Sequence, residues 1–231
     1  MHQKGNLVKN LRFATIATDV ALFTIHNQEL LVRVIPVHRP PHYHNARGLP
    51  GGLILPHETA ENAARRLLIE KGGITSSAVY LEQLATFSAL DRDPRGRVIA
   101  VAHIGLVSWS ELTDAERSTS DAAWVTAREA RNLAYDHDEM LTMAHARLAS
   151  RIGYSTIIRG LIPSEFTLTE LEQAYECVLG RPMDKRNFRK KILKLDIIRP
   201  LHRTRQGAKA RPAQLYAFAK NSIQMIDLFR T

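Results

Sequence analysis

The segment GGLILPHETAENAARRLLIEKGGI, residues 51–74, contains a glycine-rich start, a helical pattern and a second glycine pair. Gly51 and Gly52, directly after a proline, favour a tight turn. Thr59 precedes apolar residues at helical spacing, and Gly73 follows the last of them. The segment is therefore predicted to be a loop followed by a helix, on which side chains three and four positions apart share one face.

The spacing of Gly52, Glu58 and Arg66 reads G-x5-E-x7-R and resembles the Nudix box, a loop and helix that hold a divalent metal against a diphosphate. In that family the glutamate and the arginine pair and brace the loop on the helix. The resemblance therefore implies an α+β chain that begins with a Nudix domain, an α/β/α sandwich with a mixed sheet. It also implies an ion pair between Glu58 and Arg66.

The metal-binding part of this box is incomplete. Active Nudix enzymes carry three carboxylates after the arginine, at i, i+3 and i+4, which can converge on one Mg²⁺. This sequence has Leu67, Glu70 and Lys71 there, so two carboxylates are missing and an ammonium is added. Lys71 can equally be a favourable charge in the last helical turn. We expect no metal site, no catalytic residues and no hydrolysis.

The composition is that of a globular protein. With 231 residues, 45% of them hydrophobic, the chain has room for one large or two small domains. It contains no apolar run of membrane-spanning length, and its first residues lack the apolar core of a signal peptide. The cytoplasm is therefore the expected compartment. Cys177 is the single cysteine, which excludes an intrachain disulfide and favours a core position.

The positive charge is concentrated in the last third of the chain. Residues 153–231 carry 15 Lys and Arg against 7 Asp and Glu, whereas residues 1–152 carry 17 against 16. A basic segment of this size favours a polyanionic partner, although a solvated basic surface has the same composition. We place a domain boundary between residues 152 and 153, after a helix predicted over residues 136–152 and before two helix breakers, Gly153 and Pro163.

Four strands are predicted in the first part. Residues 14–34 contain two apolar runs separated by a polar Asn-Gln pair, and residues 79–90 and 98–108 form a second pair around the turn DRDPRGR. The segment HRPPHYHNARGLP, residues 38–50, is predicted to be a polar surface loop because its proline pair opposes regular structure. Its three histidines are a weaker metal-site alternative, since no cysteine or carboxylate lies among them.

The last third has the pattern of a winged helix-turn-helix. A capping box at Thr167 opens one helix, Gly180 ends it, and Asp184 can cap a second, basic helix. Two strand-like runs around the loop HRTRQGAKARP follow. In this arrangement the second helix enters the major groove of DNA. The alternative is a surface helix with a solvated basic face.

Two groups of residues are predicted to bind DNA. Arg and Asn make bidentate contacts with guanine and adenine, so the first turns of the second helix are expected to read bases. The cations of the loop are expected to bind phosphates, which adds affinity without sequence preference. The helix residues are Lys185, Arg186, Asn187, Arg189 and Lys190, of which Arg186, Asn187 and Arg189 are expected to read bases. The loop residues are Arg203, Arg205, Lys209 and Arg211.

The order of these segments resembles the Nudix-related transcriptional regulators of the NrtR family. The resemblance runs from about Asp19 to Phe218 and rests on the incomplete box and on YLEQLATF, RDPRGRVIAVAH, AYDHDEML, FTLTELEQAYE, DKRNFRKKIL and RPAQLYAF. It implies a homodimeric repressor of NAD-metabolism genes that binds a palindromic operator in double-stranded DNA. Residues 1–152 would be the effector-binding domain, and ADP-ribose or a related nucleotide bound there would release the DNA, with no cofactor required.

The effector is expected to bind beside the box. Arginine forks suit phosphate oxygens and an aromatic ring can stack on a base, although Asp, Pro and Gly in DRDPRGR are also ordinary turn residues. The predicted effector-binding residues are Arg47, Gly51, Gly52, Arg66, Glu70, Gln83, Phe87, Arg92, Asp93 and Arg97. Two alternatives remain open: an active Nudix ADP-ribose pyrophosphatase with a nucleic-acid-binding C-terminal domain, and a nucleic-acid-processing Nudix enzyme whose basic tail holds RNA.

Overall fold

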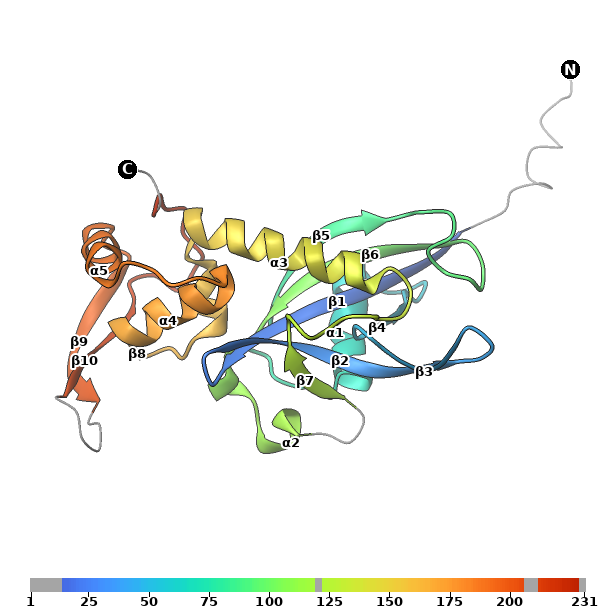
Figure 1. Cartoon of the computed structure of the whole chain (residues 1–231), viewed down its shortest axis with the longest axis horizontal. Helices are drawn as coiled ribbons and strands as arrows, with labels where there is room; N and C mark the ends of the chain where they lie inside the picture. The colour runs from blue at the N-terminus through green and yellow to red at the C-terminus, as the bar shows by residue number, and fades with distance from the viewer. Residues whose placement is uncertain (1–13, 119–121, 206–211, 229–231) are drawn as a thin grey trace, which may run out of the picture.

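The computed structural model describes residues 14–118, 122–205 and 212–228. They form an elongated molecule, with a sheet-containing half and a mainly helical half arranged along the long axis (Figure 1). None of the described helices combines the length and the apolar character needed to cross a membrane.

The first half contains a seven-stranded mixed sheet. Its strands are β1 (Thr15–His26), β2 (Glu29–Arg39), β3 (Tyr43–Gly48), β4 (Gly51–Leu53), β5 (Tyr80–Phe87), β6 (Val98–Leu106) and β7 (Ala123–Thr126). The order is β3-β2-β1-β6-β5, with β4 paired to β1 and β7 paired to β2. β1 and β6 are parallel, whereas the predicted pairs β1–β2 and β5–β6 are confirmed as antiparallel. Asn27 and Gln28 have positive φ values of 50° and 62°, as a two-residue hairpin turn requires.

Helices cover both faces of this sheet, as the predicted sandwich requires. The covering helices are α1 (Ala60–Glu70) and α3 (His137–Tyr154). Alternate residues of a strand point to opposite faces. Val20 of β1 packs in the same cluster as Leu68 of α1, whereas Ala21 packs in the cluster that contains Leu148 of α3. The helix predicted between Thr59 and the second glycine pair and the helix predicted over residues 136–152 are therefore confirmed.

Two local predictions in this half are wrong. Residues 43–48 form β3 instead of a loop, because their backbone pairs with β2. Gly51 and Gly52 form β4 instead of a turn, and they pair with Asp19 and Thr18 of β1. A Cβ atom added to Gly51 would lie 1.8 Å from Asp19 Oδ1. The glycine is therefore needed for this close approach rather than for a turn.

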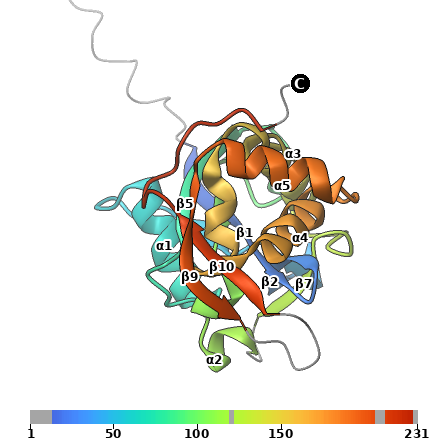
Figure 2. The ribbon, with the colours of Figure 1, turned by 90° about the vertical axis from the view of Figure 1, so that its left-hand side faces the viewer.

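The second half is a winged helix, as predicted. Its elements are η3 (Thr156–Leu161), β8 (Phe166–Thr167), α4 (Leu168–Leu179), α5 (Lys185–Lys194), β9 (Ile198–Arg205) and β10 (Ala213–Phe218). Thr167 and Glu170 form the capping box of α4, Gly180 ends it with φ of 65°, and the Asp184 side chain caps α5. Figure 2 shows α4, α5 and the β9–β10 hairpin facing the viewer at this end of the molecule.

The two halves share one apolar core. Leu106 of β6 and Ile152 of α3 are buried in the same cluster as Tyr175 of α4. Gly160 of η3 lies so close to β6 that an added Cβ would be 3.0 Å from Leu106 Cβ. The boundary proposed after residue 152 falls in the last turn of α3 and stays a prediction.

Candidate effector cavity and DNA interface

A cavity of about 480 Å³ opens beside β4, between the 91–97 loop, the end of β2 and the start of α3. The predicted effector residues that line it are Gly51, Gly52, Arg92, Asp93 and Arg97. The predicted residues that lie elsewhere are Arg47, Arg66, Glu70, Gln83 and Phe87. A larger hollow of about 1170 Å³ lies between η3 and the β9–β10 hairpin, and none of the predicted effector residues lines it.

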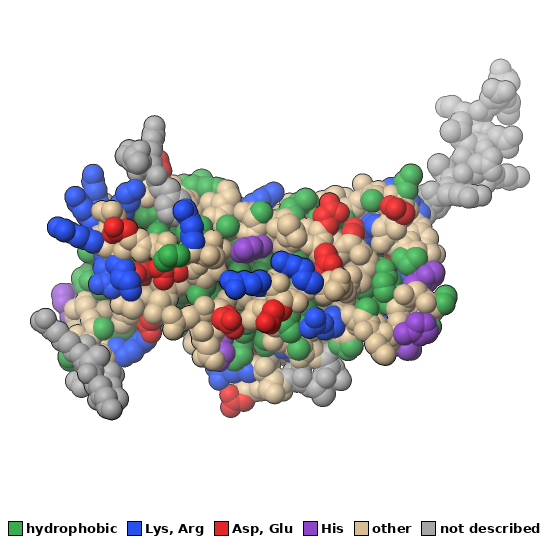
Figure 3. Space-filling model, in the orientation of Figure 1, with side chains coloured by type: hydrophobic (Ala, Val, Ile, Leu, Met, Phe, Trp, Pro, Cys, Tyr) green, Lys and Arg blue, Asp and Glu red, His purple; other side chains and the backbone are tan. Residues whose placement is uncertain are grey.

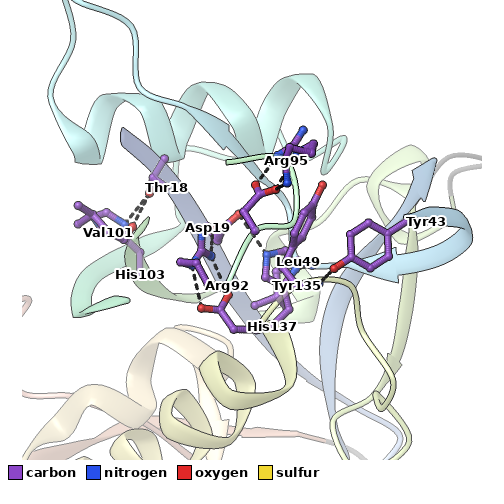
Figure 4. A network of polar contacts seen from close by, with 12 residues as sticks. Thr18, Asp19, Tyr43, Leu49, Arg92, Arg95, Val101, His103, Tyr135 and His137 are labelled. Atoms are coloured by element: carbon purple, nitrogen blue, oxygen red, sulfur yellow. Dashed lines mark hydrogen bonds and ion pairs between the residues drawn. The ribbon is translucent and has the colours of Figure 1, made fainter. Parts of the chain in front are cut away.

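A buried polar network stands at this cavity (Figure 4). Arg92 is 7% exposed, and its Nε and Nη2 donate to the Asp136 carboxylate at 2.8 and 2.7 Å. Nη2 also lies 3.7 Å from Asp19 Oδ2. His137 Nδ1 accepts from the Leu49 amide at 3.0 Å, so Nε2 of the neutral ring carries the proton, 3.4 Å from Asp19 Oδ1. Arg92 therefore ties the 91–97 loop to β1 and to the start of α3. Its Nε and Nη2 donors already have carboxylate partners.

The aromatic side chain at the cavity is Tyr135, whereas the predicted Phe87 is 7% exposed and belongs to the core. The Arg95 guanidinium lies over the Tyr135 ring, 5.3 Å from its centroid. Arg95 also donates from Nε and Nη2 to the Asp93 carboxylate at 2.9 and 2.6 Å. Burial alone would raise the pKa of Asp93, but hydrogen bonds from Arg95 hold that pKa below its usual range. Asp93 thus anchors a cation beside an aromatic face.

Three other predicted effector residues are on the surface. Gln83 of β5 and Arg47 of β3 are exposed and do not line the cavity. Arg97 is exposed at the cavity, and its Nη1 donates to the carbonyls of Ser88 and Ala89 at 2.8 and 3.0 Å. Of these three residues, Arg97 alone can meet a ligand in this cavity without a rearrangement.

The predicted brace between Glu58 and Arg66 is confirmed. Arg66 Nε and Nη2 donate to the Glu58 carboxylate at 3.0 and 2.6 Å, and Nη1 donates to Glu70 at 2.9 Å. The hydrogen bonds from Arg66 and from the Leu55 amide lower the pKa of Glu58 to about 2. The one carboxylate that remains at the metal-binding positions, Glu70, is thus bound to Arg66 instead of facing the cavity.

The other two metal-binding positions offer no acidic ligand. Leu67 is 2% exposed and packs in the core. Lys71 lines the cavity and donates from Nζ to the Gly51 carbonyl at 2.7 Å. Burial and repulsion from Arg39 lower the pKa of Lys71, and Asp19 opposes this effect. Among the described residues, no group of three or more His, Cys, Asp or Glu side chains is arranged to hold a metal ion.

The helix α5 directs its predicted DNA-binding residues in two ways. Arg186, Asn187 and Lys190 are exposed. Lys and Arg side chains gather at the end of the molecule that contains α5 (Figure 1 and Figure 3). Lys185 Nζ and Arg189 Nη2 lie 3.6 and 3.5 Å from the carboxylate oxygens of Glu172 of α4. Glu172 is 1% exposed. Arg189 also donates to the Thr169 hydroxyl of α4 at 3.0 Å. Arg189, predicted to read bases, is thus held against α4 in this structure.

Two of the predicted DNA-binding residues in the wing, the β9–β10 hairpin, are also paired. Arg203 donates to the Glu165 carboxylate, and Arg205 donates to the carboxylate of Glu170. Arg205 additionally donates to the Glu165 carbonyl at 3.1 Å. Lys209 and Arg211 lie outside the described residues. Phosphate binding by Arg203 or Arg205 would therefore exchange a carboxylate partner for a phosphate.

The predicted effector set omitted Lys71 and Arg95, which belong to the box and the turn already singled out, and four further charged or aromatic residues of the cavity: Asp19, Arg39, Tyr135 and His137. Asp19 had a detectable signal, because it is a lone carboxylate in an otherwise apolar strand, and buried charges are rare unless they are paired. The others gave no such signal. Tyr135 and His137 simply flank the first residue of a predicted helix, and Arg39 precedes a proline pair.

This architecture, a mixed sheet between two helices with a braced loop, followed by a basic winged helix, defines a Nudix-domain protein with a DNA-binding domain. Two family models match accordingly: the NUDIX domain over residues 15–144, and the NrtR DNA-binding winged helix domain over residues 159–218. The chain belongs to the NrtR family, a membership that its similarity to individual relatives also supports.

Three relatives show how far the similarity extends. The chain is 34% identical, over 88% of its length and 82% of the relative, to the ADPR responsive transcriptional repressor NtrR of Acinetobacter baylyi. Shewanella oneidensis NrtR complexed with a 27mer DNA matches with a TM-score of 0.78 and 31% identity, over 88% of this chain and 93% of that chain. The NUDIX domain of the same protein, complexed with ADP ribose, matches with a TM-score of 0.51 and 28% identity, over 64% of this chain and 99% of that chain. An ADP-ribose pyrophosphatase of Methanocaldococcus jannaschii is 33% identical over 40% of this chain and 53% of the relative.

Proposed function

We propose that this chain is a cytoplasmic transcriptional repressor of NAD-metabolism genes that binds a palindromic operator as a homodimer. ADP-ribose or a related nucleotide binds in the cavity and releases the DNA. The observation that carries this proposal is the presence, in one chain with a shared core, of a cationic cavity and a basic winged helix. Two relatives support it: the Acinetobacter protein is an ADPR responsive transcriptional repressor, and Shewanella NrtR forms complexes with a 27mer DNA and, through its NUDIX domain, with ADP ribose.

The charge of the cavity suits a diphosphate. Five cations and two carboxylates line it, a net charge of +3 with the histidine neutral. The cations are Arg39, Lys71, Arg92, Arg95 and Arg97, and the carboxylates are Asp19 and Asp93. Arginine and lysine are the usual partners of phosphate oxygens. The Tyr135 ring adds a surface on which a base can stack.

The helix α3 links the cavity to the winged helix. His137 in its first turn lines the cavity, whereas further along His145 Nε2 donates to the Val178 carbonyl of α4 at 2.9 Å. An 18-residue helix is about 27 Å long and moves largely as a unit. A nucleotide that moves the first turn would therefore also move α4 and the α5 helix packed on it. A coupling free energy of about 1–3 kcal/mol is typical of such switches and changes affinity by about 5- to 150-fold.

The release of DNA can be measured directly. An operator would be selected from random DNA with the full-length protein, labelled, and titrated by fluorescence anisotropy with and without ADP-ribose. We expect saturating ADP-ribose to weaken binding by at least about fivefold. AMP and ribose 5-phosphate, which lack the diphosphate, are the matched controls. Equal operator affinity with and without ADP-ribose would contradict the proposed function.

We further propose that the protein does not hydrolyse its effector. With Mg²⁺ and ADP-ribose we expect no turnover above background, because Glu70 is bound to Arg66, Leu67 is apolar and Lys71 is cationic. Release of AMP can be followed by chromatography. Turnover of about 1 per second or more, an ordinary enzymatic rate, would favour the pyrophosphatase alternative.

The exposed and the paired arginines should behave differently on DNA. Arg186→Ala is expected to weaken operator binding by about 1–3 kcal/mol and to relax sequence preference, because this exposed side chain is in the first turn of α5. Arg205→Ala should weaken operator and scrambled DNA equally and flatten the salt dependence. Anisotropy titrations on both DNAs over a salt series measure this. If Arg186→Ala lost affinity for both DNAs alike, Arg186 would be a phosphate ligand.

A further inference from the structure

Lys71 occupies an unusual position for a cation. It stands at one of the three positions that carry metal-binding carboxylates in active Nudix boxes, and it caps the C-terminal end of α1. Its side chain extends to β4, where Nζ donates to the Gly51 carbonyl at 2.7 Å. An ammonium has three donors, and this carbonyl takes one of them. Because Lys71 lines the cavity, the remaining donors can meet an anion there.

The glycine at position 52 leaves room for this ammonium. A Cβ atom added to Gly52 would lie 2.9 Å from Lys71 Nζ and 3.0 Å from Leu67 Cδ2. The strand β4 therefore passes directly beneath the lysine, with bare backbone at the point of contact. Burial lowers the pKa of Lys71, and the attraction of Asp19 opposes this shift by favouring the charged form.

The residues at this position do not fit a divalent ion. Mg²⁺ is bound by oxygen ligands, usually carboxylates together with substrate phosphates. The side chains here are instead a buried leucine, a glutamate held by Arg66 at 2.9 Å and a lysine ammonium. The Gly51 carbonyl, an oxygen that could help to coordinate a metal, already accepts a hydrogen bond from that ammonium.

We propose that the Lys71 ammonium supplies the positive charge that a metal ion supplies in active Nudix boxes, so that the cavity binds a nucleotide diphosphate without a metal. The inference rests on the proposed nucleotide-binding function of the cavity. A divalent ion both neutralises a diphosphate and activates the water that cleaves it. An ammonium provides charge and hydrogen bonds but does not generate a nucleophile from water. With Lys71 in place of a metal ion, the cavity would bind the nucleotide without hydrolysing it, as a sensor requires.

Calorimetric titration of the full-length protein with ADP-ribose, in EDTA and in excess Mg²⁺, tests the proposal. Wild type is expected to have the same affinity in both buffers within about twofold, a difference below 0.5 kcal/mol. Lys71→Met keeps the length of the side chain without its charge and should weaken binding by about 10- to 100-fold in EDTA, the effect of losing a charged hydrogen bond. Lys220→Met, the same change at an exposed lysine outside the cavity, is the matched control and should bind like wild type.

Operator binding in the absence of effector reports whether the Lys71→Met protein is folded, because α5 lies well apart from α1, the helix that Lys71 caps (Figure 1). Wild type that binds ADP-ribose in Mg²⁺ but not in EDTA would overturn the inference and leave the proposed function intact. Unaltered affinity of Lys71→Met would also overturn it. Wild type that fails to bind ADP-ribose in either buffer would overturn the proposed function, and the inference with it.

Discussion

Arg92→Ala should lower the free energy of unfolding by about 3–5 kcal/mol, the usual effect of removing one partner from a buried ion pair. The change leaves the Asp136 carboxylate without its two hydrogen bonds and Asp19 without the cation 3.7 Å away. Both carboxylates are largely buried, so water cannot fully replace the guanidinium. Because a domain of this kind is stable by only about 5–15 kcal/mol, urea unfolding followed by circular dichroism should show a clear shift of the midpoint.

Arg97→Ala is the matched control for this prediction, since Arg97 belongs to the same loop but is exposed. Arg97→Ala should lower the free energy of unfolding by less than about 1 kcal/mol, because water can hydrogen-bond to the carbonyls of Ser88 and Ala89. Arg92→Lys should lower the free energy of unfolding by an intermediate amount, since lysine keeps the charge but cannot make the bidentate hydrogen bonds of arginine. Equal losses for Arg92→Ala and Arg97→Ala would show that the network is already solvated. If the larger loss is observed, Arg97 rather than Arg92 is the residue to mutate in tests of effector binding.

Phe188→Ala should destabilise the protein by a similar amount, about 3–5 kcal/mol, through the cavity that it leaves. Phe188 is 3% exposed on α5, and its ring packs edge-on against Tyr175 of α4 with 5.1 Å between centroids. Since the two halves share one core, we expect the melting curve to keep a single transition at lower temperature. DNA affinity should fall for all sequences alike as the variant unfolds.

Leu193→Ala on the same helix is the control, because Leu193 is 48% exposed. It should change the free energy of unfolding by less than about 1 kcal/mol. A Phe188→Ala protein with wild-type stability but altered sequence preference would mean that Phe188 takes part in recognition rather than in packing. Two separate transitions would mean that the interface between the halves is weaker than their shared core suggests.

The elements that could be predicted from the sequence are those whose signals are local. Thr59, the Thr167–Glu170 capping box and Asp184 each accept hydrogen bonds from residues three positions away, so the start of a helix is visible in a few letters. The αL conformation of Gly180 is a local signal of the same kind. The ion pair between Glu58 and Arg66 was predicted because the family pattern contains both residues, and not because their spacing alone demands it.

Two features could not be predicted in this way: the short strands, and the face of the sheet on which a given strand residue lies. Segments such as β3 and β4 have few apolar residues, and they are strands only because β2 and β1 present backbone partners to them. Phe87 follows an irregularity of the β5–β6 pairing between Gln83 and Ala85. A bulge reverses the alternation of side chains along a strand, so the face on which Phe87 lies depends on the pairing. The ring is consequently in the core, and Tyr135 takes its place at the cavity.

The sequence by itself determined the two-domain order, the winged helix and the loss of acidic residues from the box, because each of these is a matter of residue type at a known spacing. The tertiary structure decided which charges meet. Asp19, Arg92 and His137 converge from distant parts of the chain, Arg189 is directed to Glu172 of another helix, and Lys71 reaches the carbonyl of Gly51. Contacts of this kind depend on the packing of one element against another. The sequence around a charged side chain does not show which partner it will have once it is buried.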